Sequence, residues 1–213
     1  MKNNLNLISS ALLFSLSCVT YAGGNNTDGS YISFNVGISD VNDSDAVSPI
    51  LAPGAPISLR GDNGSALSLA AGYNFGNMRL EGELAYQKND LDSISIAGAS
   101  NKITGDVSST AFLINGYYDF HNKSKFTPFV TAGLGVVNVD VSDINIVGGG
   151  LMSTPDDDSS FVYQVGAGVS YPITKKIDFD VKYRYFKASD PEFEIMTAEY
   201  SSHNLYIGIR SSF

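Results

Sequence analysis

The chain has few of the cysteine, histidine and basic residues on which thiol enzymes, redox proteins and nucleic-acid-binding proteins depend. Its 213 residues include no tryptophan, two histidines and a single cysteine, Cys18. Because Cys18 lies in a segment that we expect to be removed, the mature chain would have no thiol for catalysis, disulfide formation or metal binding. Basic residues are also few, with 13 Lys and Arg against 22 Asp and Glu. A chain this acidic repels nucleic acid, which is therefore excluded as a partner.

Long apolar runs are confined to the amino terminus. Lys2 precedes an apolar segment over residues 5–19, and Thr20-Tyr21-Ala22 places small residues where a signal peptidase reads them. We therefore expect residues 1–22 to be a cleaved signal peptide for the general secretory pathway. Residues 23–213 then form one domain by length. Beyond residue 22, no run approaches the roughly 18 apolar residues that a membrane-spanning helix needs.

A lipoprotein signal is an alternative for the same segment. Cleavage before Cys18 would allow its sulfur to be acylated, and the preceding Ser17 is compatible with such a signal. Ser15, however, stands where these signals usually carry leucine. Ordinary cleavage after Ala22 is the interpretation that we adopt.

Apolar and polar residues alternate along most of the remaining chain. The last segment places Leu205, Ile207, Ile209 and Phe213 on one face and Asn204, Tyr206, Gly208 and Arg210 on the other. The same pattern returns in seven earlier segments, at about 29–39, 64–75, 77–89, 108–120, 126–138, 160–171 and 176–187. Each is roughly the length with which a tilted strand crosses the hydrocarbon layer. The pattern predicts an all-β fold, an eight-stranded antiparallel up-and-down transmembrane β-barrel.

A soluble barrel of the lipocalin type would turn the apolar faces inward instead. The aromatic residues favour the membrane, because they fall at strand ends on the apolar face, where interfacial girdles lie. These residues are Tyr73, Phe75, Tyr86, Tyr118, Phe120, Tyr171, Tyr185 and Phe213. The two folds make opposite predictions for Leu80, Val181 and Ile207, which contact lipid in one and form the core in the other.

The polar faces of the strands carry charges of both signs. An eight-stranded barrel has an interior just filled by side chains, and buried charges persist only when they are paired. We therefore predict a lumenal charge network and a plugged barrel without a channel. Its members are Arg79, Glu81, Glu83, Asp119, Asp178, Asp180, Lys182, Arg184 and Arg210.

The connections alternate between short and long, as outer-membrane barrels require. The short turns near 74–77, 121–125 and 172–176 would face the periplasm, and their charged residues are four lysines, Lys123, Lys125, Lys175 and Lys176. The long connections, about 40–63, 88–107, 139–159 and 187–202, would face outside and hold 16 of the 22 acidic residues. The outward end is therefore predicted to be strongly negative.

Two features of the long connections allow more than one interpretation. Asp156, Asp157 and Asp158 form a weak candidate for a divalent metal site, since hard cations prefer clustered carboxylates; the alternative is a solvated acidic loop. Apolar stretches at 49–53, 94–97, 144–147 and 193–196 are either contact surfaces or extensions of the hairpins as strands.

Catalytic residue patterns are sparse. His121 falls in a short polar turn, and His203 opens the last strand near Ser201 and Ser202. An acyl hydrolase using His203, one of these serines and Glu199 is conceivable. The chain has no Gly-rich phosphate loop, no serine nucleophile elbow and no metal-binding histidine pair. We therefore predict a protein that is not an enzyme and has no cofactor.

Three segments, 126–135 (FTPFVTAGLG), 161–171 (FVYQVGAGVSY) and 203–213 (HNLYIGIRSSF), carry a resemblance. They resemble the opacity-type, outer-membrane protein A-like β-barrel superfamily of Gram-negative surface antigens. The resemblance implies an outer-membrane barrel inserted by the barrel-assembly machinery, which recognises a terminal strand ending in Phe. Leu205, Ile207, Ile209 and Phe213 match that signal, while Ser211 replaces the usual aromatic residue.

The resemblance also implies partners. Outer-membrane lipid would surround the barrel, and the long loops would contact host surface or matrix proteins. The expected function is that of a non-enzymatic surface antigen or adhesin. A purely structural membrane protein is the main alternative, and a lipid-modifying enzyme is a further one.

Overall fold

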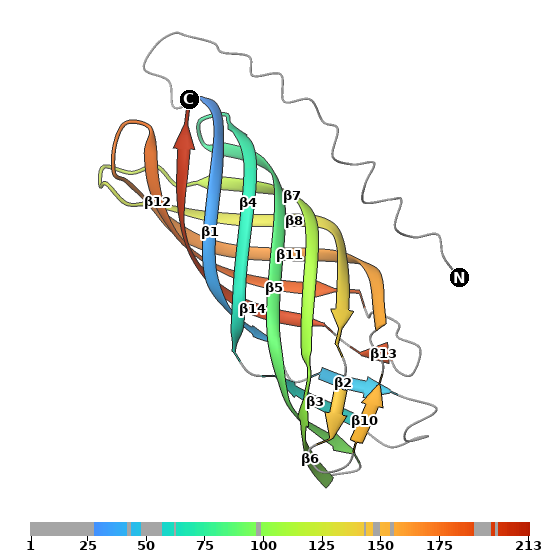
Figure 1. Ribbon diagram of the computed structural model, residues 1–213. Coiled ribbons are helices and arrows are strands. Elements are labelled where there is room, and N and C mark those ends of the chain that lie inside the picture. The colour runs from blue at the N-terminus through green and yellow to red at the C-terminus, as the bar shows by residue number, and fades with distance from the viewer. Residues whose placement is uncertain are drawn as a thin grey trace.

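Eight long antiparallel strands close into a barrel in the computed structural model (Figure 1). The structure describes residues 28–41, 44–47, 57–61, 63–96, 99–142, 144–146, 150–153, 156–189, 197–198 and 200–213. The barrel strands are β1 (Gly29–Val41), β4 (Gly64–Asn74), β5 (Met78–Ile96), β7 (Asp106–Asp119), β8 (Thr127–Val141), β11 (Asp156–Pro172), β12 (Ile177–Ala188) and β14 (Ser201–Ser212). Each pairs with the next, and β14 pairs with β1. The predicted eight-stranded antiparallel barrel is confirmed.

The expected signal peptide and the alternative fate of Cys18 lie outside the described residues and stay predictions.

The apolar face of the strands points away from the barrel axis. Leu80, Val181 and Ile207 are 53%, 39% and 49% exposed, whereas Arg79 and Arg210 are only 3% and 6% exposed. In a soluble barrel this apolar surface would be exposed to water, at a free-energy cost of about 25 cal/mol for each Å². The soluble-barrel alternative is therefore wrong, and the outer surface suits acyl chains.

Aromatic pairs mark one edge of this apolar surface, beside the short turns. Tyr73 contacts Phe75 in the β4–β5 turn, with ring centroids 4.7 Å apart. Phe126 and Tyr171 pair in the same way at 5.3 Å. They lie at the end of the barrel where the described chain begins, since Gly29 pairs with Asn74. Their position agrees with an interfacial girdle.

Six short strands extend the sheet beyond the opposite end of the barrel and are called the crown here (Figure 1). They are β2 (Ser44–Val47), β3 (Ile57–Gly61), β6 (Ala99–Thr104), β9 (Ile144–Ile146), β10 (Gly150–Ser153) and β13 (Thr197–Ala198). Residues 91–96 of β5 continue into the crown, where they pair with β3 and β6.

The crown shows which of the apolar stretches in the long connections extend the hairpins as strands. Residues 94–96 belong to β5 and 144–146 form β9, so hairpin extension is confirmed there, while 49–53 and 193–196 lie outside the described residues. β5 runs seven residues beyond its predicted end at 89 and β11 begins four before 160. These strands are longer than predicted because they remain paired at this end: the end of β5 pairs with β3 and β6, and the start of β11 pairs with the end of β8.

Glycines on the inner wall let neighbouring groups approach the backbone closely. A Cβ at Gly168 would lie 2.5 Å from Cζ of Phe129 and would also meet the carbonyl oxygen of Val181. A Cβ at Gly82, on the outer face, would have no atom within 4 Å. The inner glycines thus make room for the lumenal aromatic rings.

This difference predicts opposite outcomes for two alanine substitutions. Gly168→Ala should lower the free energy of unfolding by about 1 to 3 kcal/mol, because the wall or Phe129 must shift. Gly82→Ala should leave it within about 0.5 kcal/mol. Urea unfolding of both variants in the same vesicles measures the difference, and equal stabilities would contradict the packing described.

Candidate functional site

The lumen near the short turns contains two separate ion-pair centres. Arg79 donates from Nε and Nη2 to both carboxylate oxygens of Asp119, each at 2.8 Å. Its guanidinium lies 4.2 Å from the Tyr117 ring centroid and 5.0 Å from that of Phe129. A bidentate pair stacked on aromatic rings satisfies a buried arginine well.

Arg210 forms the second centre on the opposite wall. It contacts Asp180 at 3.2 Å and Asp178 at 3.3 Å, and it donates to the Ser170 hydroxyl at 3.2 Å. Register explains the placement, because Asp178 is the cross-strand partner of Arg210 and Asp180 lies diagonally opposite. Asp178, at the barrel end, is the more exposed of the two carboxylates.

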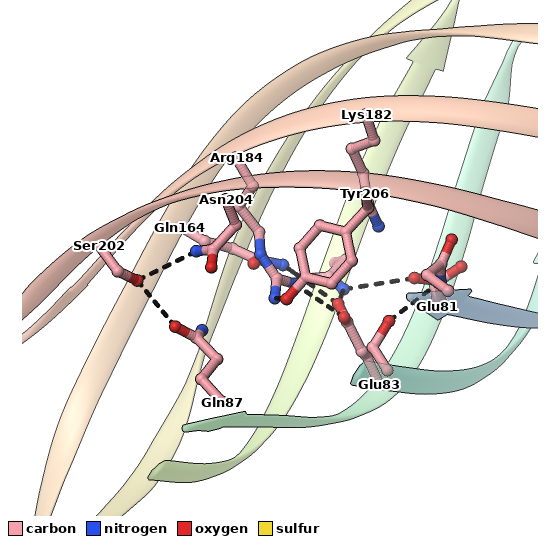
Figure 2. Close-up of polar contacts among 12 residues, drawn as sticks. Glu81, Glu83, Gln87, Gln164, Lys182, Arg184, Ser202, Asn204 and Tyr206 are labelled. Carbon is pink, nitrogen blue, oxygen red and sulfur yellow. Dashed lines mark hydrogen bonds and ion pairs between the residues drawn. The ribbon is translucent and has the colours of Figure 1, made fainter. Parts of the chain in front are cut away.

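Arg184 and Glu83 form a third ion pair, in the middle of the barrel (Figure 2). Nη1 of Arg184 lies 2.7 Å from Oε1 of Glu83, and both side chains are fully buried. The other carboxylate oxygen accepts from Nδ2 of Asn115 at 2.6 Å. Nη2 of Arg184 donates to the Tyr206 hydroxyl. Because β5 and β12 are not neighbours, this pair joins opposite walls of the barrel.

Glu81 and Lys182 complete the central level of the lumen. Glu81 accepts hydrogen bonds from the hydroxyls of Tyr31 at 3.1 Å and Tyr117 at 2.9 Å. Nζ of Lys182 donates to the Tyr117 hydroxyl at 3.4 Å and lies 5.5 Å from the Tyr206 ring centroid. Phenol groups therefore link these two charged residues to the network.

Neutral polar groups occupy the lumen nearer the crown. Oε1 of Gln87 accepts from the hydroxyls of Ser39 at 3.1 Å and Ser202 at 2.9 Å. Nδ2 of Asn204 donates to the Ser202 hydroxyl at 3.0 Å (Figure 2). The polar filling therefore continues beyond the charged residues toward the crown.

An apolar cluster fills the other side of the lumen at this end. Its buried members are Ala85, Ala111, Leu113, Val137, Val139, Val162, Phe186, Ala188 and Tyr200. Tyr200, which precedes β14, donates to the Ser109 hydroxyl at 3.1 Å, and burial raises the pKa of its phenol to about 12. The phenol therefore stays neutral at physiological pH. The cluster closes the lumen toward the crown with packed side chains.

The structure thus brings all nine residues of the predicted charge network to the inner face. Sequence reasoning placed Gln87, Asn115 and Gln164 inward but did not include them in the network, and it missed both Tyr31 and the apolar cluster. The strand alternation could have revealed the polar residues as members of the network, because it places them at inward positions. For the cluster there was no such signal, because Val136-Val137, Phe161-Val162 and Tyr185-Phe186 are apolar on both faces.

The terminal strand carries the predicted assembly signal on its outer face. Leu205, Ile207 and Ile209 alternate outward, and Phe213 follows at the barrel end. The backbone N–H of Phe213 donates to the carbonyl of Ser30 at 3.1 Å, so the final residue still contacts β1. The signal is thus part of the seam that closes the barrel; its recognition by the assembly machinery stays a prediction.

His203 lies on the outer face of β14, near the crown. Its Nδ1 is 2.6 Å from the hydroxyl of Tyr183, and its ring packs against those of Tyr183 and Tyr185. The hydroxyl of Ser202 points into the lumen, where it donates to Gln87. A His203–Ser202 catalytic pair is therefore wrong, since the two side chains occupy opposite faces of the strand. Glu199, the proposed acid, lies outside the described residues.

The candidate metal ligands fall at the start of β11. Asp156, Asp157 and Asp158 pair by backbone with Val141, Asp140 and Val139, and their side chains are outside the described part of the chain. Cation binding there stays a prediction. Among the described side chains, no three His, Cys, Asp or Glu residues group as metal ligands would.

The described residues include no helix of the length and apolarity needed to cross a membrane.

Comparison with known proteins identifies relatives over most of the chain. The family model described as outer membrane protein beta-barrel domain matches residues 8–213. Outer membrane protein PagN of Salmonella typhimurium is 32% identical over 133 residues, which are 56% of this chain and 56% of that protein. The matched part thus spans little more than half of this relative.

Two solved structures are similar in fold. Neisserial surface protein A is 21% identical with a TM-score of 0.57, and the match covers 87% of this chain and 97% of that one. OprG from Pseudomonas aeruginosa is 16% identical with a TM-score of 0.57, covering 88% and 97%. Identities this low support a common barrel architecture and leave the activity open.

Proposed function

The chain belongs to the family of outer-membrane protein β-barrel domains and lies in the outer membrane of a Gram-negative cell, where we propose that its crown contacts molecules outside that cell. In this proposal the protein is a surface antigen or adhesin that catalyses no reaction. The barrel anchors and orients the crown. Host surface or matrix proteins are the proposed partners.

The observation that supports this proposal is that the interior is filled while the two ends of the barrel differ in the length of their connections. Paired charges and the apolar cluster occupy the lumen among the described residues, which supports a plugged barrel and not a channel. At one end the hairpins finish in short turns, and at the other they extend into the crown. A structure that extends beyond the membrane on one side, on a filled and rigid support, suits contact with large partners.

The two alternatives are less well supported. A purely structural role gives no reason for strands that continue past the membrane. A lipid-modifying enzyme needs a nucleophile beside His203, and the described contacts of that ring are with Tyr183 and Tyr185.

Removal of crown segments tests the proposal. We expect that replacing 42–63 or 142–155 by a short turn reduces binding to host cells or matrix proteins by about tenfold or more, since a few residues carry most of the energy of an interface. The boundaries spare Val41, Val139 and Val141, which belong to β1 and β8. Binding to a panel of purified extracellular matrix proteins and to cultured host cells is the measurement.

A turn replacement at the other end provides the matched control. Exchanging residues 121–125 for a different short turn alters the opposite rim and should leave binding unchanged. Correct folding of every variant is checked by circular dichroism in vesicles. If both crown variants bind as well as the intact protein, the adhesin function is rejected.

A further inference from the structure

Two neighbouring turns at the periplasmic end of the barrel carry all the lysines of that end. The β7–β8 turn holds Lys123 and Lys125, and the β11–β12 turn holds Lys175 and Lys176. The two turns are adjacent because β8 pairs with β11 as far as Thr127 and Ser170. They lie side by side at one edge of the barrel (Figure 1). We refer to these four lysines as the lysine patch.

Local hydrogen bonds hold both turns in a defined shape. In the first turn, Asn122 accepts from the backbone N–H of Ser124 at 2.7 Å and donates to the carbonyl of Phe126 at 2.9 Å. In the second, Oγ1 of Thr174 accepts from the N–H groups of Lys176 at 3.2 Å and Ile177 at 3.0 Å. The lysines therefore extend from ordered backbone, which lowers the entropy lost when they bind a ligand.

The acidic side chains nearest to the patch along its own strands point away from it. The two turns contain no acidic residue. The nearest carboxylates along these strands, Asp119 and Asp178, face the lumen and pair with Arg79 and Arg210. All four lysine side chains are exposed. The patch thus presents up to four positive charges to its surroundings.

Apolar side chains next to the patch define its depth in the membrane. Phe126 and Ile173, one in each turn, are both more than half exposed on the outer surface. Phe126 packs against Tyr171 within the aromatic girdle. Residues that adjoin this girdle on the turn side lie at the level of lipid headgroups. The lysines therefore lie where phosphate groups are found.

We propose that the lysine patch binds the phosphates of anionic phospholipids in the periplasmic leaflet and so enriches these lipids on one side of the barrel. The continuity of the patch with the lipid-facing surface favours a membrane lipid over an acidic protein in the periplasm. Lysines near an anionic surface attract it additively. The opposite side of the same rim should show no enrichment, because the β4–β5 turn has no lysine and the exposed Asp28 lies beside it.

The absence of tryptophan allows a direct test with a single fluorescent probe. Phe126→Trp places the probe beside the patch, and Phe75→Trp places it in the girdle on the opposite side. Each protein is reconstituted in phosphatidylcholine vesicles that contain a fixed fraction of brominated phosphatidylglycerol or brominated phosphatidylcholine. Bromine quenches only neighbouring tryptophan, so the ratio of the two quenching efficiencies reports the local lipid composition.

We expect brominated phosphatidylglycerol to quench Trp at 126 about threefold better than brominated phosphatidylcholine, with a ratio near one at 75. Replacing all four lysines by glutamine should reduce the ratio at 126 to about one, as should high salt, which screens exposed charges. The substitutions are on exposed turns and leave the strands unchanged.

Equal ratios at 126 and 75, or a preference that survives the lysine substitutions, would overturn the proposal. Absence of any lipid preference together with lysine-dependent binding of an acidic periplasmic protein would overturn it too, in favour of that protein.

Discussion

Replacing Arg184 by methionine is expected to lower the free energy of unfolding by about 3 to 5 kcal/mol. The substitution leaves the carboxyl group of Glu83 fully buried and without its cationic partner at 2.7 Å, so that it must remain as an unpaired buried charge or take up a proton. It also removes the donor to Tyr206 and the link between opposite walls of the barrel. Urea unfolding of the refolded protein in phospholipid vesicles, followed by circular dichroism because the chain lacks tryptophan, measures the loss.

Two further variants separate a buried pair from a general effect of charge. Lys88 pairs with Asp106 at 3.3 Å on the partly exposed outer surface, so Lys88→Met should cost no more than about 1 kcal/mol. Adding Glu83→Met to Arg184→Met removes the unpaired carboxylate and should recover roughly half of the loss. Equal stability of the Arg184 and Lys88 variants would show that the lumenal network is hydrated or unpaired.

A positive charge in the middle of the outer surface should cause a loss of similar size. Ile114 lies midway along β7 and is exposed to lipid, with Gly82 and Leu134 as its cross-strand partners. Ile114→Arg is expected to cost about 2 to 4 kcal/mol, because the guanidinium must remain in hydrocarbon or deform the bilayer to reach water. The same urea titration in vesicles measures it.

The matched control lies on the same face of the same strand. Thr110 is exposed four residues nearer the crown and pairs with Tyr86, at the level expected for the outer interface. Thr110→Arg should therefore cost no more than about 1 kcal/mol. If arginine at 114 were as well tolerated as at 110, the outer surface at 114 would face water, and the placement of the barrel in the membrane would be wrong.

Because side chains occupy the lumen, the candidate interaction surfaces of the barrel are its two rims. Ion pairs, phenols and amides occupy the lumen, so the interior serves the stability of the barrel. We have proposed that the crown at one rim and the lysine patch at the other are the surfaces through which the protein meets molecules other than acyl chains. The two proposals are independent, since one concerns partners outside the cell and the other concerns the composition of the periplasmic leaflet.

The interior shows where sequence reasoning was sufficient and where it failed. Strand alternation placed Arg79, Asp119 and Arg184 inward, since successive side chains of a strand face opposite sides. It could not pair Arg184 with Glu83, because they come from strands that are not neighbours. It also missed the buried Phe186, which follows Tyr185 in the chain and is equally apolar. Where both faces are apolar, a period of two carries no information on which side is inside.

The sequence by itself determined the barrel, the face that meets lipid and the acidic composition of the long connections, because these follow from a local alternation and from composition. Only the tertiary structure decided which charges pair across the lumen, that the hairpins continue into the crown, that Ser202 and His203 occupy opposite faces, and that two lysine-bearing turns are neighbours. These features depend on strand register and closure, which bring together residues that are distant in the chain.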